Sequence, residues 1–138
     1  MYEKMLVAVD GSDHAKGALG ATAELARLAG SEVRVVHVVE LGYAGRLGPY
    51  LQEEPEEARV LVDQAVAELG EAGVKATGSL PRVLGSNAAA EIVAEAEDLG
   101  ASLIVMGSRG RSDLTGLVMG SVSHKVLHLA PCPVLIVR

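Results

Sequence analysis

Glycine and serine residues recur at a defined spacing in the last third of the chain, where they could hold a phosphate group. Gly107, Gly110 and Gly120 fit the pattern Gly-x2-Gly-x9-Gly-Ser, which ends at Ser121. Glycines let backbone N–H groups approach phosphate oxygens without interference from a Cβ atom. A Gly-Ser pair that opens a helix adds unpaired amides and the positive end of the helix dipole. The spacing favours phosphate binding; ordinary turns are the alternative in a chain with 16 glycines.

Polar side chains near these glycines could supplement the backbone donors. The hydroxyls of Ser121 and Ser123 can donate to phosphate, and Arg109 and Arg111 add local positive charge to a chain whose formal net charge is −6. No lysine stands in the order Gly-x4-Gly-Lys-Ser/Thr, so the P-loop of many nucleotide hydrolases is absent. The pattern therefore predicts phosphate binding more strongly than phosphate transfer.

Asp10, in Asp10-Gly11-Ser12, is a second candidate for chemistry. It could accept a phosphoryl group or hold a metal ion, but that chemistry also needs an Asp at the end of the third strand and a Lys at the end of the fifth. Here the third strand is expected to end near Leu84-Gly85 and the fifth at the C-terminus. It could instead be structural, because Asp and Ser stabilise the start of a helix. It could also line a ligand site, since ligands in open α/β sheets bind beyond the carboxyl ends of the strands.

Apolar runs alternate with amphipathic stretches, which predicts an α/β fold with helices on both faces of a parallel sheet. The expected strands are Met5–Val9, Val33–Val39, a weaker Val74–Leu84 that contains Pro81, Leu103–Met106 and Val134–Val137. The expected helices follow Ser12, start at Pro55, follow Ser86 and start at Ser121. The result is one doubly wound domain over residues 1–138 with five strands and four helices, in which Leu41–Glu54 is one long loop.

The helical periodicity also predicts which side chains face the core. The first helix should bury a stripe that ends at Ala29, before a terminating Gly30. The last helix should turn Val122, Val126, Leu127 and Leu129 inward. Pro81 lacks a backbone donor, so its strand should lie at the edge of the sheet.

Composition excludes several classes of partner. Aromatic residues make up 2% of the chain, and its charge is negative, which argues against nucleic acid and acidic membranes. The first residues lack a signal-peptide pattern, and no apolar run is long enough to span a bilayer. One cysteine cannot form an internal disulfide. We therefore expect a cytoplasmic protein.

These motifs together resemble the ATP-binding members of the universal stress protein family. The resemblance covers the whole chain: the opening Val7-Ala8-Val9-Asp10-Gly11-Ser12, the strand Val36-His37-Val38-Val39, the glycine pattern and the closing Cys132-Pro133-Val134-Leu135-Ile136-Val137 are all typical of it. The resemblance implies a sheet with the strand order 3-2-1-4-5. It also implies a homodimer through Val134, Leu135, Ile136 and Val137, which fits an apolar edge strand without a charge to protect it.

The resemblance further assigns roles to individual residues. Ala8, Val9 and Asp10 would line the adenosine end, and the backbone of Val38 would hold adenine. Met106 and Gly107 would flank the nucleotide. The ribose and phosphates would be held by Arg109, Gly110, Gly120, Ser121, Val122 and Ser123. The cofactor implied is ATP, with Mg²⁺ or Mn²⁺ carried by its phosphates.

Three functions are consistent with these observations. The first is a nucleotide-dependent regulatory module for the stress response, with weak or no hydrolysis. The second is a slow ATPase, and the third is a dimeric scaffold that needs no nucleotide. A dinucleotide dehydrogenase is excluded, because its Gly-x-Gly-x-x-Gly should follow the first strand, where this chain has Asp10-Gly11-Ser12-Asp13.

Overall fold

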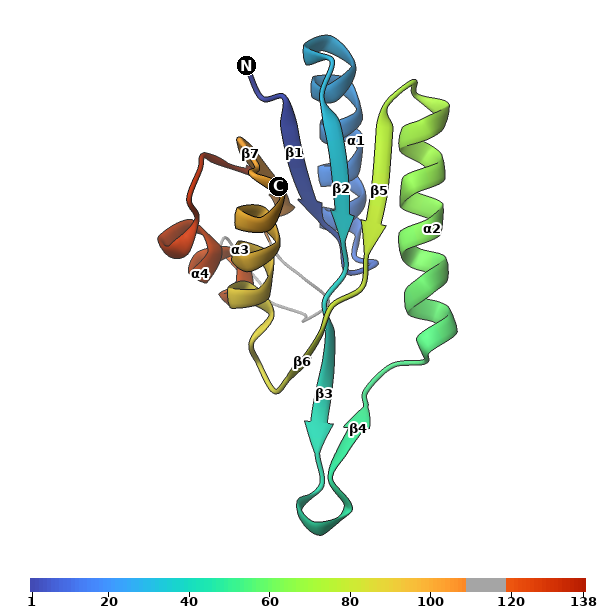
Figure 1. The fold of residues 1–138 in the computed structure, drawn as a ribbon, viewed down its shortest axis with the longest axis vertical. Helices are drawn as coiled ribbons and strands as arrows, with labels where there is room; N and C mark the ends of the chain where they lie inside the picture. Colours follow the sequence, from blue (N-terminus) through green and yellow to red (C-terminus); the bar gives the residue numbers. More distant parts are fainter. Residues whose placement is uncertain (109–118) are drawn as a thin grey trace.

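A computed structural model describes residues 1–108 and 119–138, and it confirms the predicted α/β architecture. Five parallel strands form the main sheet in the order β5-β2-β1-β7-β8, which is the 3-2-1-4-5 layout (Figure 1). These strands are β5 (Lys75–Ser79), β2 (Glu32–Val36), β1 (Lys4–Ala8), β7 (Leu103–Gly107) and β8 (Val134–Val137). The glycine pattern falls partly outside the described residues, because Arg109 and Gly110 lie in the gap.

Helices cover both faces of the sheet, as the nearly continuous apolar strands require. They are α1 (Asp13–Ala29), α2 (Pro55–Glu71), α3 (Ala88–Leu99) and α4 (Ser121–Leu129). One core cluster joins α1 and α2 to side chains such as Met5 and Val35. The other joins α3 and α4 to Leu6, Ile104 and Met106. None of the helices in the described ranges is both long and apolar enough to cross a membrane.

Local sequence signals set the helix ends. The Ser12 hydroxyl accepts from the amide of Ala15 at 3.1 Å, as an N-cap does. Gly30 and Gly100 end α1 and α3 in the left-handed conformation, with φ values of 67° and 70°. Pro55 occupies the first turn of α2, where its missing N–H costs nothing.

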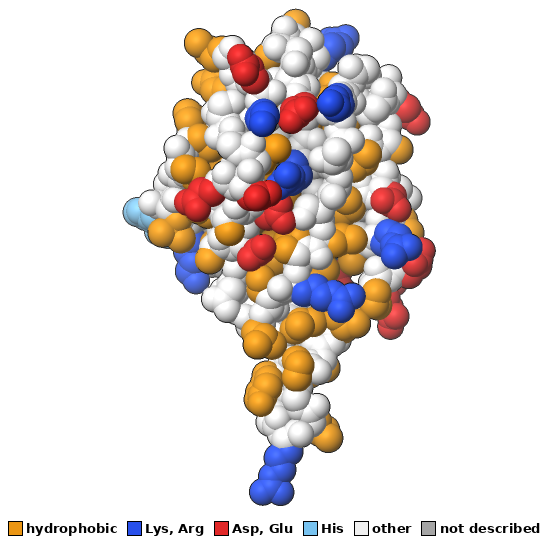
Figure 2. Space-filling view, in the orientation of Figure 1, with side chains coloured by type: hydrophobic (Ala, Val, Ile, Leu, Met, Phe, Trp, Pro, Cys, Tyr) orange, Lys and Arg blue, Asp and Glu red, His pale blue; other side chains and the backbone are white. Residues whose placement is uncertain are grey.

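The predicted long loop was wrong, because residues 39–51 form a projecting hairpin that we call the arm. It contains β3 (Val39–Tyr43), the short 3-10 helix η1 (Gly45–Leu47) and β4 (Pro49–Leu51). With β6 (Arg82–Leu84) these strands make a second sheet in the order β4-β3-β6. The predicted second and third strands are therefore each split, into β2 and β3 and into β5 and β6. Figure 1 shows the arm extending from the body, and Figure 2 shows apolar side chains on its surface.

Three predictions of burial were also wrong. Ala29, Leu127 and Leu129 are exposed, although each was expected to face the core. Leu127 and Leu129 are two positions apart on a helix, about 200° around its axis, so they cannot both share the face of Val126. α4 buries only Ser123 and Val126.

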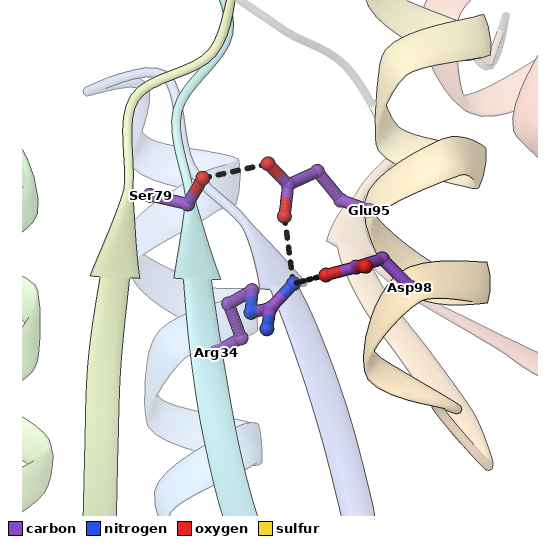
Figure 3. A network of polar contacts seen from close by, with 4 residues as sticks. All are labelled: Arg34, Ser79, Glu95 and Asp98. Carbon is purple, nitrogen blue, oxygen red and sulfur yellow. Dashed lines mark hydrogen bonds and ion pairs between the residues drawn. The ribbon is translucent and has the colours of Figure 1, made fainter.

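A polar network joins β2, β5 and α3 on one face of the sheet (Figure 3). Arg34 donates from Nη1 to Glu95 Oε2 at 2.9 Å and to Asp98 Oδ2 at 3.1 Å. The hydroxyl of Ser79 donates to the other oxygen of Glu95 at 2.7 Å. Burial opposes the charge on Arg34, but hydrogen bonds and attraction to Asp98 and Glu95 outweigh it and raise its pKa. The network fixes α3 over the β5 side of the sheet.

Two glycines provide a matched test of this packing. A Cβ on Gly78, in β5, would meet Val62 Cγ1 of α2 at 2.4 Å, whereas a Cβ on Gly20, in α1, meets nothing within 4 Å. Gly78→Ala should therefore lower the free energy of unfolding by about 1–3 kcal/mol through overpacking. Gly20→Ala should raise it by about 0.5–1 kcal/mol, because alanine favours a helix interior. Urea denaturation measures both, and changes of the same sign would contradict this packing.

Candidate functional site

A pocket of about 500 Å³ lies at the carboxyl ends of β1 and β7, where the sheet order reverses. Every described residue of the predicted site lines it: Ala8, Val9, Asp10, Val38, Met106, Gly107, Gly120, Ser121, Val122 and Ser123. Its other walls come from Ala15, Val36, His37, Glu40, Gln52, Glu53, Ala88 and Ile92. Arg109 and Gly110, which were also predicted, lie outside the described residues. The fold therefore brings together side chains that are far apart in the sequence.

One end of the pocket offers open backbone groups at Val38. The backbone groups of successive residues point alternately to the two sides of this segment. The carbonyl of Val36 faces β1 and accepts from Val9, and the amide of His37 donates to the carbonyl of Ser79 on the other side. Val38 faces the side of β1 again, but β1 ends at Ala8. Among the described residues, neither the N–H nor the C=O of Val38 has a hydrogen-bond partner. A donor and an acceptor on one residue are thus available to a ligand.

The other end of the pocket is the amino terminus of α4. Gly120 is its N-cap, and the amides of Ser121, Val122 and Ser123 come before the first amide bonded within the described helix, that of His124. Hydrogen bonds hold this terminus in place: Gly120 N–H donates to the carbonyl of Ser108 at 2.6 Å, and the hydroxyl of Ser123 donates to the same carbonyl at 3.1 Å. The Ser123 hydroxyl serves the backbone, so its amide is the group left for a ligand.

Gly107 has a packing role that the sequence analysis did not predict. A Cβ atom there would lie 2.7 Å from the Cβ of His14 and 2.9 Å from its carbonyl carbon. The first turn of α1 therefore crosses the end of β7 at a distance that only glycine permits. His14 Nδ1 also lies 3.2 Å from the hydroxyl of Ser108. These contacts fix the floor between the two ends of the pocket.

Asp10 combines the structural and the ligand-facing interpretations. Its Oδ1 accepts from the amide of Ser12 at 2.9 Å, which shapes the turn into α1, and the residue also lines the pocket. Asp10, Glu40 and Glu53 give the described walls three carboxyl groups, and no lysine or arginine lines those walls. An anionic group is therefore best placed at the α4 terminus, away from these acids.

His37 and Glu53 are pocket residues that the sequence analysis missed. His37 is 4% exposed, and its ring nitrogens lie 2.9 Å from the carbonyl oxygen of Val9 and 2.8 Å from Oε1 of Glu53. A histidine inside an otherwise apolar strand must find polar partners, and that signal was available for His37. No comparable signal marked Glu53.

The family model described as the universal stress protein family matches residues 1–138. The chain belongs to the universal stress protein family. Its relatives include the universal stress protein YxiE of Bacillus subtilis, which is 37% identical with both chains fully covered. A universal stress protein from Thermus aquaticus is also 37% identical over both complete chains.

Solved structures of the family agree with the fold. A universal stress protein from Archaeoglobus fulgidus is 34% identical over 100% of both chains, with a TM-score of 0.79. Another structure, of the universal stress protein from Archaeoglobus fulgidus in complex with dAMP, is 32% identical, covers 99% of this chain and 98% of that one, and has a TM-score of 0.77. Family membership and the sheet order were therefore both predicted correctly.

Proposed function

We propose that this universal stress protein binds ATP in the pocket at the carboxyl edge of its sheet and acts as a nucleotide-dependent regulatory module. The observation that carries the proposal is that one pocket has open backbone groups at both ends. Val38 offers a donor beside an acceptor, and the start of α4 offers successive amides. The volume of about 500 Å³ falls within the range of small-molecule sites.

Adenine fits the Val38 end, because a ring nitrogen that accepts stands next to an amino group that donates. Other bases also pair a donor with an acceptor, so the choice of adenine rests further on a relative that was solved with dAMP. Asp10 can accept hydrogen bonds from ribose hydroxyls between the two ends. The phosphates, with their Mg²⁺ or Mn²⁺, would face the amides of Ser121, Val122 and Ser123, where the helix dipole stabilises negative charge.

The proposed activity is ATP binding with weak or no hydrolysis of the ATP. Efficient phosphoryl transfer needs positioned cations and a group that orients the attacking water. Among the described residues, the proposed phosphate end of the pocket offers backbone amides and the hydroxyl of Ser121. The hydroxyl of Ser123 already donates to the carbonyl of Ser108. Slow ATP hydrolysis and a cytoplasmic location of the protein stay predictions.

Two substitutions of Ser121 distinguish a phosphate contact made by its backbone amide from one made by its hydroxyl. Ser121 is the first helical residue, where proline is accepted, and Gly120 has ψ 156°, which suits a residue before proline. Ser121→Pro should weaken Mg·ATP binding about 10- to 100-fold, because it deletes one hydrogen bond to a charged group. Ser121→Ala keeps the amide and should cost less. Calorimetric titration of nucleotide-stripped protein measures both.

Two outcomes of this titration would contradict the proposal. No binding by the wild type at millimolar Mg·ATP would end the nucleotide assignment and favour the scaffold. Equal affinities for wild type and Ser121→Pro would show that the α4 terminus does not hold the phosphates. Thermal unfolding of each variant confirms that the fold is intact.

We further propose a homodimer through β8, which is an edge strand of the main sheet. The carbonyl of Pro133 accepts from Ile104 of β7, and that of Val137 accepts from Ser108, the residue after β7. The alternating residues Val134 and Ile136 therefore direct their backbone groups to the open edge. Exposed apolar side chains on α4, Leu127 and Leu129, enlarge the apolar surface next to this strand. An apolar edge of this kind tends to pair with another chain.

Proline at position 136 tests this dimer. Ile136→Pro removes an outward N–H without removing a hydrogen bond to β7, and should convert dimer to monomer. Ile136→Ala removes more apolar side chain than Ile136→Pro does but keeps the N–H, and should remain dimeric. Sedimentation at micromolar concentration distinguishes the two. A monomeric wild type, or a dimeric Ile136→Pro, would contradict pairing through β8.

A further inference from the structure

One side of the sheet that the arm forms with β6 carries apolar side chains that the body of the molecule leaves uncovered. Alternate residues of a strand point to opposite sides of a sheet, and residues directly opposite one another share a side. The register pairs Leu41 with both Leu51 and Leu84, and it pairs Tyr43 with Pro49. These five residues therefore share one side, which we call the apolar arm face. Tyr43, Leu51 and Leu84 are 69%, 39% and 53% exposed.

The other side of the same sheet has a different environment. Glu40 lies on that side and lines the pocket, and Gly42 is paired there with Tyr50. A Cβ atom added to Gly42 would overlap the ring of Tyr50, so this ring covers the glycine. The pocket and the tyrosine thus belong to one side of the arm, and the apolar arm face is left for a partner.

The edge of this sheet is less suited to a partner than its face. β4 is an edge strand in the order β4-β3-β6, and its first residue is Pro49. Proline has no N–H to offer an added strand, and proline on an edge strand is one of the features by which natural sheets avoid edge pairing. We therefore expect contact through the apolar arm face.

Charges of opposite sign lie at the two ends of the arm. Arg46 belongs to η1 at the tip, next to Leu47, which is 89% exposed. Figure 2 shows positive charge at this outer end. At the base, where the arm leads into α2, Glu54, Glu56 and Glu57 are exposed around the start of the helix. Among the described residues, no ion pair engages Arg46 or these three glutamates.

We propose that the apolar arm face binds the same face of a second copy of this chain, with the two arms antiparallel about a twofold axis. In such a pair each tip meets the base of the other arm, whatever the length of the arm. Arg46 of each copy then faces the glutamates at the base of the other, while the apolar faces cover each other. Arg82 shares this side of the sheet on β6, so each tip meets the base on its β4 side.

A second copy is the occupant because one arm carries both halves of the match. Its apolar face is complementary to itself, and its basic tip is complementary to its own acidic base. A twofold interface uses the same patch on both partners, so it needs this kind of self-complementarity. The interface is separate from the proposed pairing through β8 and does not depend on nucleotide.

The size of the apolar arm face limits the strength of this contact. Its strands have three to five residues each, so the face spans roughly 15 Å in each direction. That area is well below the roughly 800 Å² that each partner contributes to a stable interface. We expect a Kd above about 100 µM for two isolated arms. Copies already paired through β8 would be joined by their arms into tetramers or longer assemblies.

Reversing the charge at the tip and at the base tests the arrangement. Arg46→Glu reverses the tip, and Glu56→Lys with Glu57→Lys reverses the base. Sedimentation velocity at low salt compares each protein at about 5 µM and about 500 µM. The wild type should form larger species at the higher concentration, and each variant alone should not, because its tips and bases repel. An equimolar mixture of the two variants should associate again, since tip and base then carry opposite charges at both contacts.

Two exposed leucines provide a matched test of the apolar contact. Leu84 lies on the apolar arm face, whereas Leu28, which is 80% exposed, lies near the end of α1 and outside the arm. Leu84→Glu should weaken the association at least about tenfold, because it removes apolar surface from the interface and adds a charge there. Leu28→Glu adds the same charge elsewhere and should leave the association unchanged. Thermal unfolding confirms that each variant is folded.

Three results would overturn this inference. The first is a wild type that keeps the same species at both concentrations. The second is a mixture of the tip and base variants that stays dissociated, and the third is equal association of Leu84→Glu and Leu28→Glu. A monomeric wild type at about 5 µM would count against pairing through β8 alone, since arm pairing is read from the change with concentration. Failure to bind ATP would count against the proposed function and would leave this test unaffected.

Discussion

The pairing of β1 with β7 at the centre of the sheet is the constraint on which the pocket depends. Met5 to Val7 lie in register with Leu103 to Val105, so both strands end at the same edge. The chain leaves β1 into α1 on one face, while α4 packs on the opposite face. The helices of the described ranges therefore diverge at the strand ends, and ligands bind at such reversals in open α/β sheets. The first turn of α1 packs so closely on Gly107 that an added Cβ atom would lie 2.7 Å from the Cβ of His14.

The break between β2 and β3 gives the pocket its polarity. β1 ends at Ala8, and Val38, which lies between β2 and β3, has both backbone groups open as far as the described residues are concerned. At the opposite end lie the first amides of α4, which have no hydrogen-bond partner in ranges 1–108 and 119–138. The carboxyl groups of Asp10, Glu40 and Glu53 line the walls. A ligand with a neutral hydrogen-bonding base at one end and negative charge at the other matches this distribution.

The fold was largely predictable because its signals are local. Ser12, Gly30 and Gly100 cap helices through their own backbone preferences, and continuous β-branched runs mark strands buried on both faces. The arm was not predictable in this way, because its strands pair with each other and with β6 rather than with a buried face. The exposure of Leu127 and Leu129 depends on which elements cover α4, and helical periodicity does not contain that information.

The described part of the predicted site converges on one pocket, because its residues sit at strand ends and a helix start whose positions follow from the fold. The contact of His37 with Glu53 joins residues across the arm, so it depends on the tertiary path of a segment that was expected to be a loop. The packing role of Gly107 also needed the structure, since it depends on how closely α1 approaches the end of β7.

The most direct test of this account is a crystal structure of the protein with Mg²⁺ and a non-hydrolysable ATP analogue. We expect the adenine edge within hydrogen-bond distance of the Val38 backbone, with the phosphates around the amides of Ser121 to Ser123. A nucleotide bound in the reverse direction, with its phosphates at Val38, would contradict the account, as would a nucleotide bound anywhere else on the molecule.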